Sequence, residues 1–319
     1  MMYTVEFFMA STQEILLPYT HSMQYVDVGN NASICCYHWK KMDAQTSSPS
    51  LDTIVIVHGW LDHGSAWNSV ARYLLEYGYD VVAIDNRGHG RSFHIADHDS
   101  YHFSDYLSDL HSVLTQLQLA QYTLLGHSMG GTIVSMFASV IGHIDPTLQP
   151  KSIILVDGLG PKHEEPEDAF LRLRTHISQR KSPISHRAMT PNIAKQKIAR
   201  AYPFLDATSV ALLFQENTIQ IDNALKNTVW RWDAKHRLRS AIGFDLPRYL
   251  HTLSRIDIPC HIVFGKTSWY LELPDIPARI KAIPHVQTQS VLPSGHCPHL
   301  ECPELLAHTI HSSLSTHKT

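Results

Sequence analysis

The segment Gly126-His127-Ser128-Met129-Gly130-Gly131 combines the residue types of a nucleophilic serine site. It follows a short apolar run, 122–125, and precedes apolar residues at helical spacing over 132–141. A serine on such a sharp strand-to-helix turn has strained backbone angles and an exposed hydroxyl, and the flanking glycines leave room for the turn to close. The amide of Met129, at the helix N-terminus, could donate to a developing oxyanion. The segment therefore predicts Ser128 as a nucleophile.

Short runs of apolar, mostly β-branched residues recur along the chain and alternate with helical patterns. Strands are expected at 53–57, 80–84, 122–125, 152–156, 261–264 and 288–292, with leading antiparallel strands at 26–28 and 33–39. The leucines of 104–117 and the apolar residues of 132–141 fall on helical stripes. This order predicts an α/β fold with a mostly parallel central sheet and helices on both faces. Active sites on such sheets lie at the carboxyl ends of the strands.

The alternation is interrupted between residues 158 and 257, where no strand is expected. Helical patterns are found there at 169–178, 194–202 and 209–225. A loop of that length without secondary structure is implausible in a compact domain. We therefore expect an α/β core made of residues 1–157 and 258–319, with residues 158–257 inserted as a helical cap.

Three further segments stand directly after expected strands. His58-Gly59-Trp60 follows 53–57, Asp-Asn-Arg-Gly-His-Gly-Arg-Ser at 85–92 follows 80–84, and Ser294-Gly295-His296 follows 288–292. Together with the serine segment, their order and spacing resemble the α/β-hydrolase fold superfamily. The resemblance extends over residues 51–161 and 258–319, and segments 58–67 and 156–161 are most similar to its serine hydrolase-like branch.

The resemblance implies a role for each of these segments. Ser128 would be the nucleophile, and His296 the base that activates it and then protonates the leaving group. The backbone amides of Trp60 and Met129 would form the oxyanion hole, so the Trp60 indole would matter only for the pocket wall. Residues 85–92 are interpreted as a structural turn.

The acid of the triad departs from the commonest pattern of the superfamily. Gly265-Lys-Thr-Ser268 places a serine where many members carry the carboxylate. Asp157, directly after the strand at 152–156, is favoured, because some branches take their acid from that position. Glu272 is the alternative acid, and Asp275 lies in the same loop. Asp157 could also be only a turn-forming residue before Gly158.

Two groups of metal-ligand residue types were weighed, and no metal site is expected at either. The first group recurs in what reads as a polar loop: His94, Asp97, His98, Asp99 and His102. The second group is broken by prolines, which disturbs the spacing of structural zinc sites: His296, Cys297, His299 and Cys302. Nucleotide-binding glycine motifs are absent, so no cofactor is expected.

Composition limits the classes of partner and compartment. The 319 residues carry 26 Lys plus Arg against 29 Asp plus Glu, a net charge of −3, which does not favour a nucleic acid as partner. No apolar run is long enough to span a membrane. The five cysteines form no disulfide framework, and no Lys or Arg precedes Lys40, so a secretory signal is not indicated. We expect a cytoplasmic protein that acts on a small-molecule substrate.

The sequence thus favours a serine hydrolase that acts on a small or medium acyl ester or a related carbonyl compound through an acyl-enzyme. A C–C bond hydrolase or a cofactor-free oxygenase would use the same fold with Ser and His. Dehalogenase and epoxide hydrolase chemistry is disfavoured, because both need a carboxylate at position 128. A non-catalytic binding protein is the alternative of a different class, and the serine at position 268 keeps it open.

Overall fold

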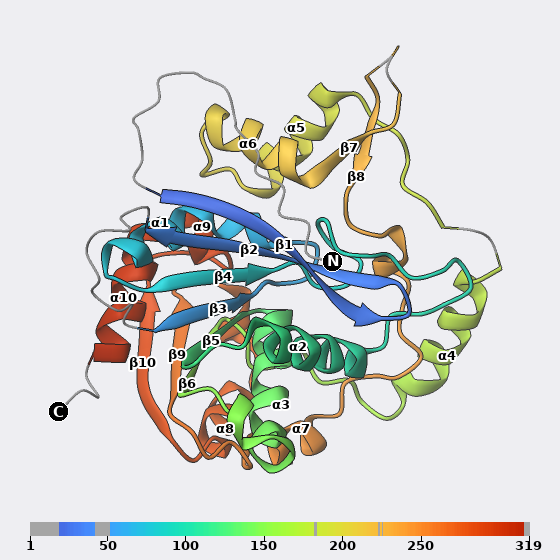
Figure 1. The fold of residues 1–319 in the computed structure, drawn as a ribbon. Helices are drawn as coiled ribbons and strands as arrows, with labels where there is room; N and C mark the ends of the chain where they lie inside the picture. The colour runs from blue at the N-terminus through green and yellow to red at the C-terminus, as the bar shows by residue number, and fades with distance from the viewer. Residues whose placement is uncertain (1–18, 42–51, 182–183, 223, 225, 316–319) are drawn as a thin grey trace.

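The computed structural model describes residues 19–41, 52–181, 184–222, 224 and 226–315. In this part of the chain, eight strands form one sheet in the order β1-β2-β4-β3-β5-β6-β9-β10 (Figure 1). Their bounds are β1 Tyr19–Gly29, β2 Ala32–Lys41, β3 Thr53–Val57, β4 Asp80–Ile84, β5 Tyr122–His127, β6 Ser152–Val156, β9 Cys260–Gly265 and β10 Val286–Leu292. In this sheet β3, β4, β5, β6, β9 and β10 pair in parallel. β1 pairs with β2, and β2 with β4, in antiparallel orientation. The expected α/β class is confirmed.

The central strands are buried on both faces, as their β-branched sequences indicate. Every residue of β5 and β6 is buried, and β3 and β4 are buried after their first residue. β10 lies at the sheet edge, and only its last residue is buried. The leading antiparallel strands are confirmed, but they are longer than the sequence pattern predicted.

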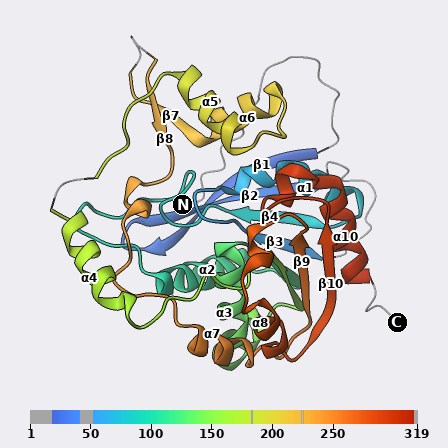
Figure 2. The same cartoon turned by 180° about the vertical axis from the view of Figure 1, so that it is seen from behind.

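Helices cover both faces of the sheet, as Figures 1 and 2 show from opposite sides. One face packs against α1 and α10, and the other against α2, α3, α7 and α8. The bounds are α1 Asn68–Glu76, α2 Phe103–Leu117, α3 Met129–Ile144, α7 Leu246–Leu253, α8 Ile276–Ala282, α9 Pro298–Glu301 and α10 Pro303–Ser315. Each face has its own apolar cluster, centred on residues such as Trp67 on one side and Val134 on the other. None of the helices in the described residues is long and apolar enough to cross a membrane.

Besides α7, the described part of the segment 158–257 contains three α-helices and, contrary to the sequence-based expectation, a strand pair. The elements are α4 Asp168–Gln179, α5 Pro191–Ala201, α6 Ala207–Asn217, β7 Thr218–Gln220 and β8 Thr228–Trp230. The helix expected at 209–225 was wrong in its second half, because Thr218 leaves the helical conformation and β7 pairs with β8. The Thr218 hydroxyl donates to the carbonyl of Phe214 and so caps the end of α6.

Two parts of this segment pack on the core in different ways. Ile198 of α5 and Leu213 of α6 join the apolar cluster that contains Trp67. α7 packs instead against α3 and α8 on the opposite face. The division into a core and a cap at residues 158–257 stays a prediction.

Candidate active site

Ser128 occupies a strained turn between β5 and α3. Its φ of 51° and ψ of −116° lie outside the regions that a non-glycine residue normally adopts. The turn closes so tightly that a Cβ on Gly126 would overlap the backbone of Gly130. The amide of Ser128 donates to the carbonyl of Val156 at 3.0 Å, which ties the turn to the end of β6. This strand-turn-helix geometry matches what the serine segment predicts.

His296 lies between the serine and a buried carboxylate. Its Nε2 is 3.0 Å from Oγ of Ser128, and its Nδ1 is 3.2 Å from Oδ2 of Asp157. Asp157 has no exposed surface, and its Oδ1 accepts a hydrogen bond from the Gly265 amide at 3.1 Å. The positive φ of Asp157, 43°, shows that the residue also forms a turn. Asp157 is thus both a positive-φ residue directly after β6 and a neighbour of the imidazole, and its role as the acid stays a prediction.

The other acid candidates lie elsewhere. Glu272 is exposed at the end of a 3₁₀ turn, and none of the contacts among the described residues joins it to His296. Asp275 accepts a hydrogen bond from the buried Arg279 guanidinium at 2.5 Å. Ser268, at the position where many relatives carry the acid, has its Oγ 3.5 Å from Nδ1 of His296. The structure thus brings Ser128, His296 and Asp157 together without Glu272.

The segment His58-Gly59-Trp60 lies against the serine. A Cβ on Gly59 would be 3.2 Å from Cβ of Ser128, so the backbone of this segment borders the nucleophile. Among the described residues, neither the Trp60 amide nor the Met129 amide donates a hydrogen bond. The Trp60 side chain is 53% exposed. The indole thus lies at the surface of the molecule, and the oxyanion role of the two amides stays a prediction.

His58 holds this segment in place, a role that the sequence did not indicate. Its Nε2 accepts a hydrogen bond from the Asn86 amide at 2.9 Å, and its Nδ1 lies 2.7 Å from the carbonyl of Gly59. Burial lowers the pKa of His58, which favours the neutral ring that can accept at one nitrogen and donate at the other.

The model of the Alpha/beta hydrolase family matches residues 54–309. The chain belongs to this family. A serine hydrolase-like protein of Danio rerio is 28% identical over 246 residues, covering 74% of this chain and 73% of that protein. A non-heme chloroperoxidase of Burkholderia pyrrocinia is 27% identical over 276 residues, covering 83% of this chain and 88% of that protein. The solved thioesterase domain from the curacin biosynthetic pathway is 29% identical with a TM-score of 0.78, covering 91% of this chain and 99% of that domain. The family and these relatives identify a hydrolase-type enzyme.

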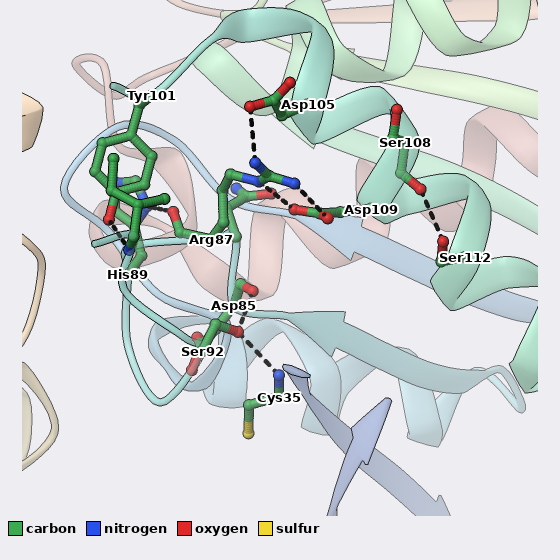
Figure 3. A network of polar contacts seen from close by, with 12 residues as sticks. Cys35, Asp85, Arg87, His89, Ser92, Tyr101, Asp105, Ser108, Asp109 and Ser112 are labelled. Atoms are coloured by element: carbon green, nitrogen blue, oxygen red, sulfur yellow. Dashed lines mark hydrogen bonds and ion pairs between the residues drawn. The ribbon is translucent and has the colours of Figure 1, made fainter. Parts of the chain in front are cut away.

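In this α/β hydrolase, the turn at residues 85–92 is held by internal hydrogen bonds. Ser92 donates to the Asp85 carbonyl at 2.6 Å and accepts from the Cys35 amide at 2.9 Å (Figure 3). Arg87 forms ion pairs with Asp109 and with a second aspartate of α2. These contacts join β2, β4 and α2, and they agree with a structural role for the turn.

A second histidine, His127, contacts the backbone of His296. Its Nε2 lies 2.7 Å from the carbonyl of His296, so this nitrogen must carry the hydrogen and donate it. Burial holds the pKa of His127 well below its ordinary value, and the ring is neutral. The contact was missed from the sequence because His127 read only as part of the serine segment.

The histidines at 94, 98 and 102 lie in the loop before α2, as expected. His98 has 86% of its side chain exposed and lies 3.6 Å from Asp99. Cys297 and Cys302 are both free thiols. Among the described residues, neither the group at 94–102 nor the group at 296–302 forms a cluster of metal ligands by itself.

Proposed function

We propose that this protein is a serine hydrolase of small or medium acyl esters or related carbonyl compounds, with Ser128, His296 and Asp157 as its triad. One observation carries the proposal. Two consecutive contacts, of 3.0 and 3.2 Å, join the hydroxyl of a strained serine through an imidazole to a buried carboxylate. This is the arrangement that nucleophilic serine catalysis requires.

The chemistry follows from the position of each group. Nε2 of His296 takes the proton of Ser128 as its Oγ attacks the carbonyl carbon of the substrate. The amides of Trp60 and Met129 stabilise the oxyanion that forms. His296 then protonates the leaving alcohol, and a water that the same imidazole activates releases the acid. Asp157 accepts from Nδ1 of His296, fixes the tautomer and stabilises the imidazolium.

The position of Asp157 weakens the argument for a non-catalytic protein. Ser268 stands where many relatives carry the acid, and a serine cannot stabilise an imidazolium as a carboxylate does. Asp157 supplies a carboxylate from the neighbouring strand β6, and the Gly265 amide orients it. The lost carboxylate at position 268 is thus no sign of a lost triad.

We further propose that the segment 158–257 covers the site and selects the substrate. Glu216 of α6 lies 3.1 Å from Nη2 of Arg91 and accepts from the Ser65 hydroxyl at 3.4 Å. Ser65 and Arg91 belong to the loops that follow β3 and β4. These contacts tie the segment to the carboxyl edge of the sheet, where Ser128 also lies.

A thioester is the second candidate substrate. It is favoured by the similarity to the thioesterase domain, which extends over nearly the whole of that domain. Ester and thioester hydrolysis would form the same acyl-enzyme, but a thiolate leaves more readily than an alkoxide. Thioester cleavage would therefore depend less on His296 as a general acid.

The test combines covalent labelling with turnover. A fluorophosphonate probe should label the wild-type protein and fail to label Ser128→Ala. A panel of p-nitrophenyl esters and matched acyl thioesters of rising chain length should then be turned over by the wild type alone. Labelling that persists in Ser128→Ala would contradict the assignment of Ser128 as the nucleophile. Labelling without turnover of either series would favour C–C bond hydrolysis, oxygenase chemistry or a binding role.

A further inference from the structure

Behind the nucleophile, three side chains from separate segments of the chain converge. They are Asp62 of the loop after β3, His127 at the end of β5, and His299 of α9. Each offers one ligand atom, and the three atoms all lie within 4.8 Å of one another. The rings of His127 and His299 are 3% and 1% exposed, and the Asp62 side chain is 13% exposed.

The hydrogen bond of the His127 ring leaves one lone pair of that ring unused. Nε2 of His127 donates to the carbonyl of His296, so in the neutral ring Nδ1 carries the lone pair. Among the described residues, this Nδ1 has no hydrogen-bond partner. A Cβ on Gly59 would come within 2.9 Å of it, and only the glycine leaves that space open. A histidine whose second nitrogen donates to a carbonyl is in the arrangement that metal ligands commonly show.

Asp62 and His299 are spaced like two ligands of one cation. Nε2 of His299 lies 3.2 Å from Oδ2 of Asp62, a contact that the protonated ring would make as an ion pair. Two ligands of a tetrahedral zinc ion with bonds of about 2.0 to 2.1 Å are roughly 3.3 Å apart. Stacking on Trp67, with centroids 4.5 Å apart and planes within 6°, holds the His299 ring in this position.

We propose that Asp62, His127 and His299 form a binding site for a divalent transition cation of the Zn²⁺ class. Two imidazoles and one carboxylate suit Zn²⁺ and leave a position open for water, whereas Mg²⁺ and Ca²⁺ prefer oxygen ligands alone.

Occupation of this site acts on the active site through His127. The ligand atoms of Asp62 and His299 are already 3.2 Å apart, so any closing of the site to about 3.3 Å occurs at His127, whose ligand atom lies within 4.8 Å of both. The hydrogen bond of His127 to the His296 carbonyl transmits that shift to the base, which lies 3.0 Å from the Ser128 hydroxyl. The cation is therefore an inhibitor, and this consequence rests on the proposed function. A displacement of about 1 Å lowers kcat by roughly 10- to 100-fold.

The test is a calorimetric titration of tag-free protein with ZnCl₂, and with MgCl₂ for comparison. Wild type should bind one Zn²⁺ per chain and no Mg²⁺. Asp62→Asn and His299→Gln should weaken Zn²⁺ binding at least about tenfold. The matched control is His98→Gln, which removes an exposed histidine next to Asp99 and should bind Zn²⁺ as the wild type does. Thermal melts without metal establish that each variant is folded, and Asp62→Asn keeps the size of the side chain if His299→Gln does not fold.

Binding and inhibition are measured separately. Equal Zn²⁺ binding by wild type, Asp62→Asn and His299→Gln, or no binding by wild type, would overturn the site. Zn²⁺ should also lower ester turnover of wild type and His98→Gln but not of His299→Gln. Binding without inhibition would overturn the coupling to His296. Because the calorimetric measurement needs no activity, it tests the site even if the proposed hydrolysis is not found.

Discussion

Asp157 and His296 are 139 positions apart in the sequence, and Oδ2 of the aspartate lies 3.2 Å from Nδ1 of the histidine. Asp157 directly follows β6, and His296 follows β10. The strand β9 lies between these two strands in the sheet, and its Gly265 amide binds the other carboxylate oxygen. The carboxylate therefore reaches the imidazole from a different strand than in the commonest pattern of the superfamily.

This relationship predicts the effect of Asp157→Asn. The amide keeps the size of the side chain but donates towards Nδ1, so His296 would be held in the wrong tautomer. We expect kcat to fall by about 10²- to 10⁴-fold with thermal stability nearly unchanged. Glu272→Gln, on the exposed 3₁₀ turn, is the matched control and should change kcat only slightly. A severe Glu272→Gln with a near-normal Asp157→Asn would reduce Asp157 to a turn residue.

The proposed roles of Ser128 and His296 predict that removal of either side chain lowers kcat. Ser128→Ala deletes only the hydroxyl, and kcat for a p-nitrophenyl ester should fall by roughly 10³-fold or more while the thermal melt stays the same. His296→Ala should lower kcat by about the same factor, because the effects of substitutions within one catalytic unit are not additive. The double variant provides the check. If it were far worse than either single variant, the two residues would not act as a unit.

Trp60→Phe separates the backbone role of this residue from its side chain. The substitution keeps the proposed amide donor and changes only an exposed aromatic surface. We expect the ranking of esters by chain length to change more than the maximal kcat. The measurement is kcat/KM over the ester panel. A uniform loss on every ester, in a folded protein, would give the indole a direct part in the chemical step.

The turn at 85–92 predicts a loss of stability for Gly90→Ala. Gly90 has a φ of 53°, and a Cβ there would overlap the Asp85 carboxylate. We expect the free energy of unfolding to fall by about 3 kcal/mol or more in a urea titration. Gly29→Ala is the control, because its φ of 93° is also positive but no atom lies within 4 Å of the added Cβ. Gly29→Ala should lower the free energy of unfolding by about 1 to 2 kcal/mol. Equal losses would mean that the contact with Asp85 does not matter.

Buried histidines predict that the fold is sensitive to acid. Burial lowers the pKa of His236 to about 4, against the opposing effect of Asp233, and also lowers that of His38 to about 4. In the unfolded chain both take up protons near pH 6.5, so the folded state binds fewer protons and stability falls as the pH drops from 6.5 towards 4. The melting temperature should decrease over this range, and His236→Gln should flatten the slope. A melting temperature that is constant or rises over this range would contradict the prediction.

Local pattern was sufficient for much of the fold. The β-branched runs gave the bounds of β3, β4 and β6, because a strand buried on both faces must be apolar at every position. The same pattern did not predict β7 and β8. Each of these strands has three residues, too few for an alternation of apolar and polar side chains to be recognised. The antiparallel pairing that stabilises them is a tertiary contact.

The candidate site divides in the same way. Ser128 lies two residues from Gly126 and from Gly130, and His296 directly follows Gly295. The backbone conformation that these turns require therefore selects glycines that are visible in the sequence. Asp157 and Glu272 carry no such mark, because either carboxylate can follow a strand. The sheet order, which places β6 and β10 on either side of β9, decided that Asp157 meets the imidazole. Packing between segments distant in the sequence likewise brought Asp62 to His127, since no local spacing relates a loop after β3 to the end of β5.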